Sequence, residues 1–318
     1  MISYIYFGLN QYSDYISLAV WCKYMTIGNL LSNPKYAHKW ILEKLICHYC
    51  DIGREQMWID IDKDVPDGTI DNILLWYKKY TEDKMPLEYI LWKVTFLWYN
   101  FVVSKDTLIP RPETEYMIQA INEYVTDLSD LVLLDVGTWC GVLGLSVLLH
   151  NPWVFATALL SDYSDDALSV AKQNYALFED SIQANQKATA MHFLHVSLVE
   201  YLHDYRASLT GKSAVLVANL PYIPDETFDT SADDTVKKWE PRMAFVGGDD
   251  GLDLYRIMFD QLLQFQSTEE KLEKVVLFLE MMTWQVEILR EAYGDKMIFE
   301  EVKTFHFNIR IVKAIIKE

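Results

Sequence analysis

The chain has 318 residues, enough for about two domains and a sizeable core, and its 51% hydrophobic and 23% charged residues are typical of an ordinary globular protein. Its net charge of -18 opposes tight binding of nucleic acid, because that binding relies on Lys and Arg to neutralise phosphates. Four scattered cysteines are too few for a disulfide framework, and no apolar run approaches the roughly 18 residues of a membrane span, so a cytoplasmic protein that contacts no membrane is predicted.

The first part of the chain is predicted to be helical. Residues 1–24 have no firm hydrophobic period and are interpreted as an N-terminal extension of uncertain status. Apolar residues then recur at helical spacing, as over 37–49, so residues 25–85 are expected to form a small helical domain that docks a substrate. The run Cys47-His48-Tyr49-Cys50 has metal-ligand spacing, but no second pair completes four ligands, and no metal is predicted.

Residues 86–108 are richer in β-branched and aromatic side chains, which predicts a β-hairpin that links two domains. The remainder, 109–318, alternates strands with helices and so predicts an α/β fold with a parallel sheet and right-handed crossovers. Seven strands are expected, and the last two are close enough to pair antiparallel. The expected strands span 131–135, 154–160, 190–196, 214–218, 275–280, 297–302 and 307–315.

Two strand ends in this region have the pattern of a nucleoside site. The strand at 131–135 ends in a turn that runs to Gly141, and a helix follows. Asp162 ends the next strand about 25 positions beyond Gly137, where an acidic side chain suits the two hydroxyls of a ribose. The dinucleotide fingerprint GxGxxG is absent. DxGxxxG with a later strand-end acid favours S-adenosylmethionine instead.

The tetrapeptide Asn219-Leu220-Pro221-Tyr222 follows the buried strand at 214–218, and its proline makes it a rigid loop at the carboxyl end of a strand, where ligands of α/β sheets bind. A planar NH2 group is a poor nucleophile, because its lone pair is delocalised. Asn219 offers a side-chain acceptor for one N–H, the main-chain carbonyl of Leu220 or Pro221 offers a second, and Tyr222 offers a flat wall. Methylation of a planar nitrogen is one interpretation, although such a tetrapeptide is more often only a turn.

These stretches together resemble the HemK/PrmC protein-glutamine methyltransferases, which methylate the glutamine amide of the GGQ motif in class I peptide chain release factors. The resemblance spans 25–318 and is most specific at Leu108 to Glu115 (LIPRPETE) and from Glu240 to Asp253. It implies a seven-stranded Rossmann-like class I methyltransferase sheet, S-adenosylmethionine as cofactor, a monomer, and a release factor as the partner of the helical domain.

The resemblance also assigns roles by position. Asn219 and Tyr222 would be catalytic, and the loop Asn219, Leu220, Pro221 and Tyr222 would bind the glutamine amide. The cofactor-binding residues would be Asp135, Gly137, Thr138, Trp139, Gly141, Asp162, Asn219, Arg111 and Thr114.

Three departures from the family pattern stand out. Leu220 replaces the first proline of Asn-Pro-Pro-Tyr, which leaves the carbonyl in place but makes the loop less rigid. The run Val196-Ser197-Leu198 has no acid where many relatives carry one near the adenine. Trp139 stands in the turn where glycine lets the backbone approach the cofactor, and an indole would fill that space.

Trp92, Trp98 and Trp284 likewise stand where the family pattern has glycine. At typical usage the chain would carry roughly 22 glycines, but it has 12, together with 10 tryptophans. One interpretation is that the gene uses UGA as a glycine codon, so that the natural protein has glycine at most of these sites, and UGG codons there would contradict it. The alternative is a tryptophan-rich core. A genuine Trp139 would predict poor cofactor affinity or no activity.

Three other functions stay open. A glutamine methyltransferase that acts on a ribosomal protein shares the same loop. Methylation of adenine in DNA or RNA uses a similar loop on a flipped base, but the acidic charge and the lack of a basic recognition domain oppose it. The third is a catalytically inactive module that binds a release factor, which becomes serious if Trp139 is genuine.

Overall fold

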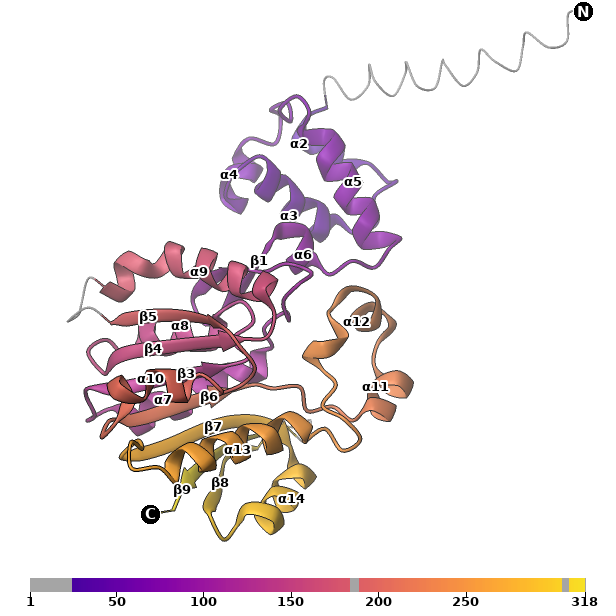
Figure 1. Ribbon diagram of the computed structural model, residues 1–318. Coiled ribbons are helices and arrows are strands. Elements are labelled where there is room, and N and C mark those ends of the chain that lie inside the picture. Colours follow the sequence, from indigo (N-terminus) through magenta and orange to yellow (C-terminus); the bar gives the residue numbers. More distant parts are fainter. Residues whose placement is uncertain (1–24, 184–188, 305–308, 318) are drawn as a thin grey trace, which may run out of the picture. The chain divides into compact units, whose positions relative to one another are not determined.

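The structure is a computed structural model that describes residues 25–183, 189–304 and 309–317. The chain divides into two compact units between Leu91 and Trp92 (Figure 1). The expected extension at 1–24 and the expected start of the last strand at residue 307 lie outside the described residues. Within the described residues, no helix is long and apolar enough to cross a membrane.

The first unit is helical, with α2 (Ile27–Ser32), α3 (Lys39–Tyr49), α4 (Arg54–Ile59), α5 (Thr69–Thr81) and α6 (Leu87–Leu91). The helix expected over 37–49 is α3, which buries Ile41, Leu42, Leu45 and Ile46 along one stripe. That spacing gives an amphipathic helix one apolar face, and burial of this face against α5 stabilises the unit.

Residues 87–91 form helix α6 instead of the first strand of the expected hairpin. The preceding proline is compatible with a helix start, and Leu87 and Ile90, three positions apart, both reach the apolar core of the first unit. The hairpin itself is shorter than expected. It consists of β1 (Lys93–Phe96) and β2 (Tyr99–Val102), with a two-residue turn between Phe96 and Tyr99.

The second unit contains a seven-stranded sheet in the order β5-β4-β3-β6-β7-β9-β8. Its strands are β3 (Leu131–Val136), β4 (Phe155–Asp162), β5 (Ala190–His195), β6 (Ser213–Ala218), β7 (Lys274–Met282), β8 (Met297–Thr304) and β9 (Ile309–Ile316). The strands β3 to β7 run parallel, and β9 is antiparallel to both of its neighbours, β7 and β8. The predicted seven-stranded Rossmann-like sheet is confirmed, and the strand order reverses direction between β3 and β6, where such folds bind ligands.

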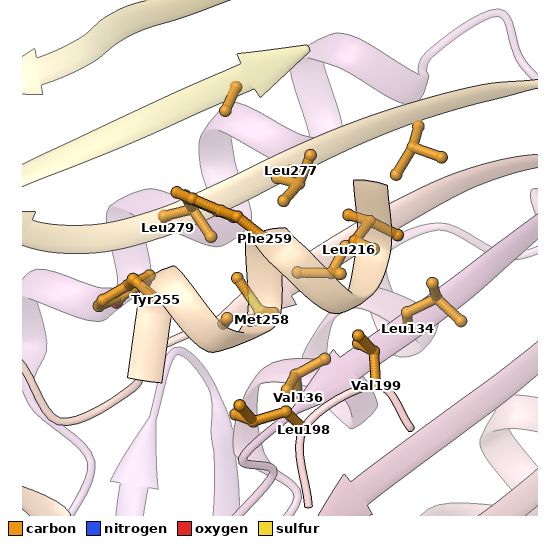
Figure 2. Packing of buried hydrophobic residues seen from close by; sticks show 14 of the residues in the cluster. Leu134, Val136, Leu198, Val199, Leu216, Tyr255, Met258, Phe259, Leu277 and Leu279 are labelled. Carbon is orange, nitrogen blue, oxygen red and sulfur yellow. The ribbon is translucent and has the colours of Figure 1, made fainter. Parts of the chain in front are cut away.

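Helices cover both faces of this sheet. On one face, α13 (Asp253–Gln266) packs Tyr255, Met258 and Phe259 over the central strands (Figure 2). The helices α10 (Leu202–Leu209) and α14 (Thr283–Tyr293) add to the same apolar core. The other face is covered by α7 (Glu115–Val125), α8 (Val142–His150) and α9 (Asp165–Gln183). The loop after β6 leads to α11 (Asp225–Ser231) and α12 (Asp234–Trp239). With helices on both faces, the sheet is the middle one of three layers.

Candidate active site

The candidate site lies at the carboxyl ends of four neighbouring strands. Gly137 follows β3, Asp162 ends β4, Asn219 follows β6, and Glu280 lies near the end of β7. Because β3, β4, β6 and β7 run parallel, these residues meet at one edge of the sheet. This edge includes the β3–β6 reversal, so the sequence-predicted turn, strand-end acid and Asn219 loop are brought together.

Asp135 holds the turn after β3 in place. It is fully buried, and its Oδ2 accepts hydrogen bonds from the Thr138 hydroxyl (2.5 Å) and the Gly144 N–H (2.9 Å). Burial raises the pKa of Asp135 to about 7. The same turn touches the Asn219 loop, because Gly137 has a φ of +69° and a β-carbon there would lie 2.9 Å from the side chain of Leu220. Glycine at 137 therefore serves both the turn and the close approach.

Asp162 lines the larger of two cavities at this edge. Its Oδ1 accepts a hydrogen bond from the Ser164 N–H and its Oδ2 from the Trp139 N–H, each at 2.8 Å. Burial raises its pKa, although these backbone donors oppose the shift. The cavity has a volume of about 420 Å³, within the range of small-molecule sites. Its walls include Gly137, Trp139, Asp162, Tyr163, Ser197, Leu198, Leu220 and Pro221. We name it the nucleoside cavity.

A second cavity of about 250 Å³ lies on the other side of the Asn219 loop, and we name it the amide cavity. It is lined by Leu108, Arg111, Glu113, Asn219, Tyr222, Ile223, Ala244, Phe245 and Glu280. One short loop thus contributes to both cavities, with Leu220 and Pro221 on the nucleoside side and Asn219 and Tyr222 on the amide side. Residues 243–246 likewise contribute to both cavities.

Glu280 organises the wall of the amide cavity. The Thr114 hydroxyl donates to its Oε2 at 2.8 Å and the Tyr222 hydroxyl donates to its Oε1 at 3.0 Å. The side-chain nitrogen of Asn219 donates a hydrogen bond to the Thr114 hydroxyl oxygen (3.4 Å). The side-chain carbonyl oxygen of Asn219 is therefore not the atom that faces Thr114. Burial raises the pKa of Glu280, and burial beside this carboxylate holds the pKa of Tyr222 well above its usual value. Tyr222 therefore remains a neutral donor at physiological pH.

The backbone of the Asn219 loop is held from two sides. The Leu220 N–H donates to the Tyr255 hydroxyl oxygen (3.3 Å), and the Tyr222 carbonyl accepts from the Gln285 side chain (2.7 Å). The Pro221 carbonyl lies against Gly247, where a β-carbon would overlap it. These contacts replace the rigidity that a proline at Leu220 would have supplied.

Arg111 is tied to a segment far away in the sequence. Its guanidinium contacts the buried carboxylate of Glu240 at 2.6 Å, and Glu240 also accepts a hydrogen bond from the Ile109 N–H. The guanidinium lies over the ring of Phe245. The two most specific motifs of the sequence, LIPRPETE and the stretch that begins at Glu240, therefore form one wall of the amide cavity.

The other predicted site residues support the walls from behind. Asp135, Thr138 and Gly141 shape the turn after β3, and Thr114, at the end of the 3-10 turn Pro112–Thr114, positions Glu280 and Asn219. Sequence reasoning missed Glu280. The available signal was one carboxylate inside the otherwise apolar stretch of β7.

The chain was also compared with known proteins. No protein-family model matches it. The release factor glutamine methyltransferase of Bacillus cereus is 29% identical over 224 residues, which is 69% of this chain and 73% of that protein. Its counterpart from Clostridium acetobutylicum is 35% identical over 182 residues, or 57% and 58% of the two chains. The second alignment thus spans less than two thirds of the relative.

Among solved structures, the E. cuniculi Mtq2–Trm112 complex, which methylates the eRF1 termination factor, has a TM-score of 0.43 and 15% identity and covers 67% of this chain and 99% of its own. The family assignment depends on the sequence relatives, of which many share the same description. The assignment agrees with the strand order of the sheet and with the contact between Arg111 and Glu240, which joins the two most specific motifs. These sequence relatives support the HemK/PrmC family, the release factor glutamine methyltransferases, as the family that this chain resembles.

Proposed function

We propose that this protein transfers a methyl group from S-adenosylmethionine to the side-chain amide nitrogen of the GGQ glutamine in class I peptide chain release factors. The observation that carries the proposal is the Asn219 loop, which contributes both to a cavity of nucleoside size and to a smaller cavity that Glu280 and Tyr222 line. The descriptions of the B. cereus and C. acetobutylicum relatives support the choice of substrate.

The nucleoside cavity fits one part of the cofactor. Asp162 accepts one backbone hydrogen bond on each carboxylate oxygen, and each oxygen retains capacity to accept a ribose hydroxyl. Tyr163, Ser197 and Leu198 would surround the base. The fit fails at Trp139, whose indole lines the nucleoside cavity and packs against residues of the amide cavity. When bound, the cofactor would supply an electrophilic methyl carbon on a sulfonium.

The chain's own residues would hold the glutamine amide. We assign one acceptor to the side-chain carbonyl of Asn219, because its amide nitrogen faces Thr114. We assign the second to the Leu220 carbonyl, because the Pro221 carbonyl lies against Gly247 and the Tyr222 carbonyl already accepts from Gln285. Two acceptors in the plane of the amide would fix the direction of the nitrogen and supply most of the rate through orientation.

The charge in the amide cavity suits the same reaction. The amide nitrogen gains positive charge as a methyl group is added, so acceptors and anions around it stabilise the transition state more than the ground state. Glu280 and Glu113 both line this cavity, and the Arg111 guanidinium, which also lines it, is paired with Glu240. Thr114 and Tyr222 hold the Glu280 carboxylate in one orientation, so little reorganisation is needed during the reaction.

The remaining assignments follow from the family. Residues 25–85 would dock the release factor, 86–108 would link the units, and 109–318 would carry the chemistry. The protein would act as a cytoplasmic monomer without direct contact to nucleic acid. Leu220 stands where the family has a proline, and the segment with Leu198 lacks the acid that many relatives carry near the adenine. Both residues line the nucleoside cavity, so these differences would change cofactor affinity more than the chemical step.

The direct test incubates the protein with a class I release factor and methyl-labelled S-adenosylmethionine, for the chain as given and for Trp139→Gly. Mass spectrometry of the GGQ peptide should show one added methyl group on the glutamine. Asn219→Ala in the Trp139→Gly background serves as the control and should show none. Methylation of a ribosomal protein and not of the release factor would replace this substrate by its nearest rival.

A further inference from the structure

Trp139 has a backbone conformation that favours glycine. Its φ is +52°, and Trp92 and Trp153 have φ values of +55° and +77°. The left-handed region is costly for bulky residues, because the β-carbon approaches the following carbonyl oxygen. Within the described residues, three of the eight non-glycine residues with positive φ are tryptophans, whereas tryptophan makes up 10 of the 318 residues. Trp98 and Trp284, which the family pattern also marks, are not among the eight.

The side chains give no reason for this conformation. Trp92 and Trp153 are 51% and 63% exposed, so neither gains much from burial. Trp139 is buried, but its indole N–H has no hydrogen-bond partner among the described residues. A buried indole N–H normally has a partner, since leaving it unpaired costs its full desolvation.

The backbone of residue 139 has a clear role that needs no side chain. Its N–H donates to Asp162 Oδ2 at 2.8 Å and so joins the turn after β3 to the end of β4. A glycine at this position would make the same hydrogen bond without the strain of a β-carbon. The requirement at residue 139 is therefore for a backbone donor in the left-handed conformation.

The indole of Trp139 lies between the two cavities. It lines the nucleoside cavity. It also packs in one apolar cluster with Leu108, Ala244 and Phe245, which line the amide cavity. The ring therefore contacts residues that line both cavities.

We propose that residue 139 is a glycine position, that its indole closes the passage between the nucleoside cavity and the amide cavity, and that its removal joins them into one channel for the cofactor. Trp92 and Trp153 occupy glycine positions of the same kind, outside the channel. The inference about the channel depends on the proposed function, because it names S-adenosylmethionine as the ligand.

The test compares three variants with the chain as given by calorimetric titration with S-adenosylhomocysteine. Trp139→Gly removes both the ring and the backbone strain, and Trp139→Ala removes the ring but keeps a β-carbon. Trp153→Gly is the matched control, because it relieves the same kind of strain before β4 begins, at the opposite end of that strand from Asp162. Both variants at 139 should bind at least tenfold more tightly than the chain as given, while Trp153→Gly should bind within threefold of it.

Affinity of the chain as given within threefold of both variants at 139 would overturn the inference, and so would an equal gain in Trp153→Gly. Circular dichroism checks that each variant is folded. If Trp139→Gly does not fold, Trp139→Ala still tests the inference. Methyl transfer is measured separately. Tight binding by both variants at 139 without methylation of any release factor would refute the proposed function and leave the closed passage supported.

Discussion

Glu280→Gln is the sharpest probe of the amide cavity. The glutamine has nearly the same shape, but it replaces one carboxylate oxygen by an NH2 group that cannot accept. Two hydroxyls, from Thr114 at 2.8 Å and Tyr222 at 3.0 Å, now donate to the carboxylate, and only one of them can donate to the new carbonyl. A hydrogen bond to a charged group contributes about 1.5–3 kcal/mol.

The loss should appear in turnover. Thr114 positions the Asn219 amide, and the carboxylate charge lies at the cavity where positive charge develops. Removal of about 1.5–3 kcal/mol from the transition state lowers the rate about 10- to 150-fold. In a Trp139→Gly background we expect this fall in kcat for release factor methylation, with cofactor affinity within threefold, because Glu280 lines the amide cavity and not the nucleoside cavity.

The pH dependence of stability gives a second measurement on Glu280→Gln, separate from its activity. Burial raises the pKa of Glu280 above its unfolded value, so the folded state binds more protons and stability is lost as pH rises through the window above 4.5. Glutamine does not titrate and has no such loss. The free energy of unfolding of Glu280→Gln, measured relative to that of the parent, should therefore increase from pH 5 to pH 8.

The exposed carboxylate of Glu287, paired with Arg290 on α14, provides the control, and Glu287→Gln should change neither quantity measurably. Unchanged kcat in Glu280→Gln would refute the role of Glu280. The role would also be refuted if kcat fell only in proportion to the fraction of Glu280→Gln that is unfolded.

Three further outcomes can be checked. In the Trp139→Gly background, Asn219→Ala should abolish methylation and leave S-adenosylhomocysteine affinity within threefold, and residual turnover above about a tenth of that background would contradict its role as acceptor. Burial raises the pKa of Asp135 from 3.8 to about 7, so the parent should lose stability as pH rises through this window, by at most about 1.4 kcal/mol per pH unit from this group. In denaturant titrations, the free energy of unfolding of Asp135→Asn should fall less steeply with pH than that of the parent. An equal dependence on pH would exclude Asp135 as its source. Trp153→Gly should relieve about 1 kcal/mol of backbone strain and raise the melting temperature of the second unit by about 2–4 °C in calorimetry, whereas a lower melting temperature would contradict the glycine assignment.

The sequence alone determined the elements whose signal is local. An unbroken apolar run such as residues 131–134, in β3, can only be a buried strand or a buried helix segment, and its length and the glycine turn after it favoured the strand. The same logic placed the loop at Asn219 on the carboxyl side of β6, and the alternation of elements implied the sheet. Helix α6 escaped this reasoning because a five-residue apolar segment is compatible with either period, and contacts with the helical core decided it.

Only the tertiary structure decided which distant residues share a wall. Nothing local in the sequence pairs Arg111 with Glu240 or directs Thr114 and Tyr222 at Glu280, since these contacts depend on how four strand ends and two loops converge. The sequence marked residue 139 as unusual through its neighbours. The positive φ and the position of the indole between two cavities emerged only from the folded chain, because backbone strain and cavity shape arise from packing and not from residue order.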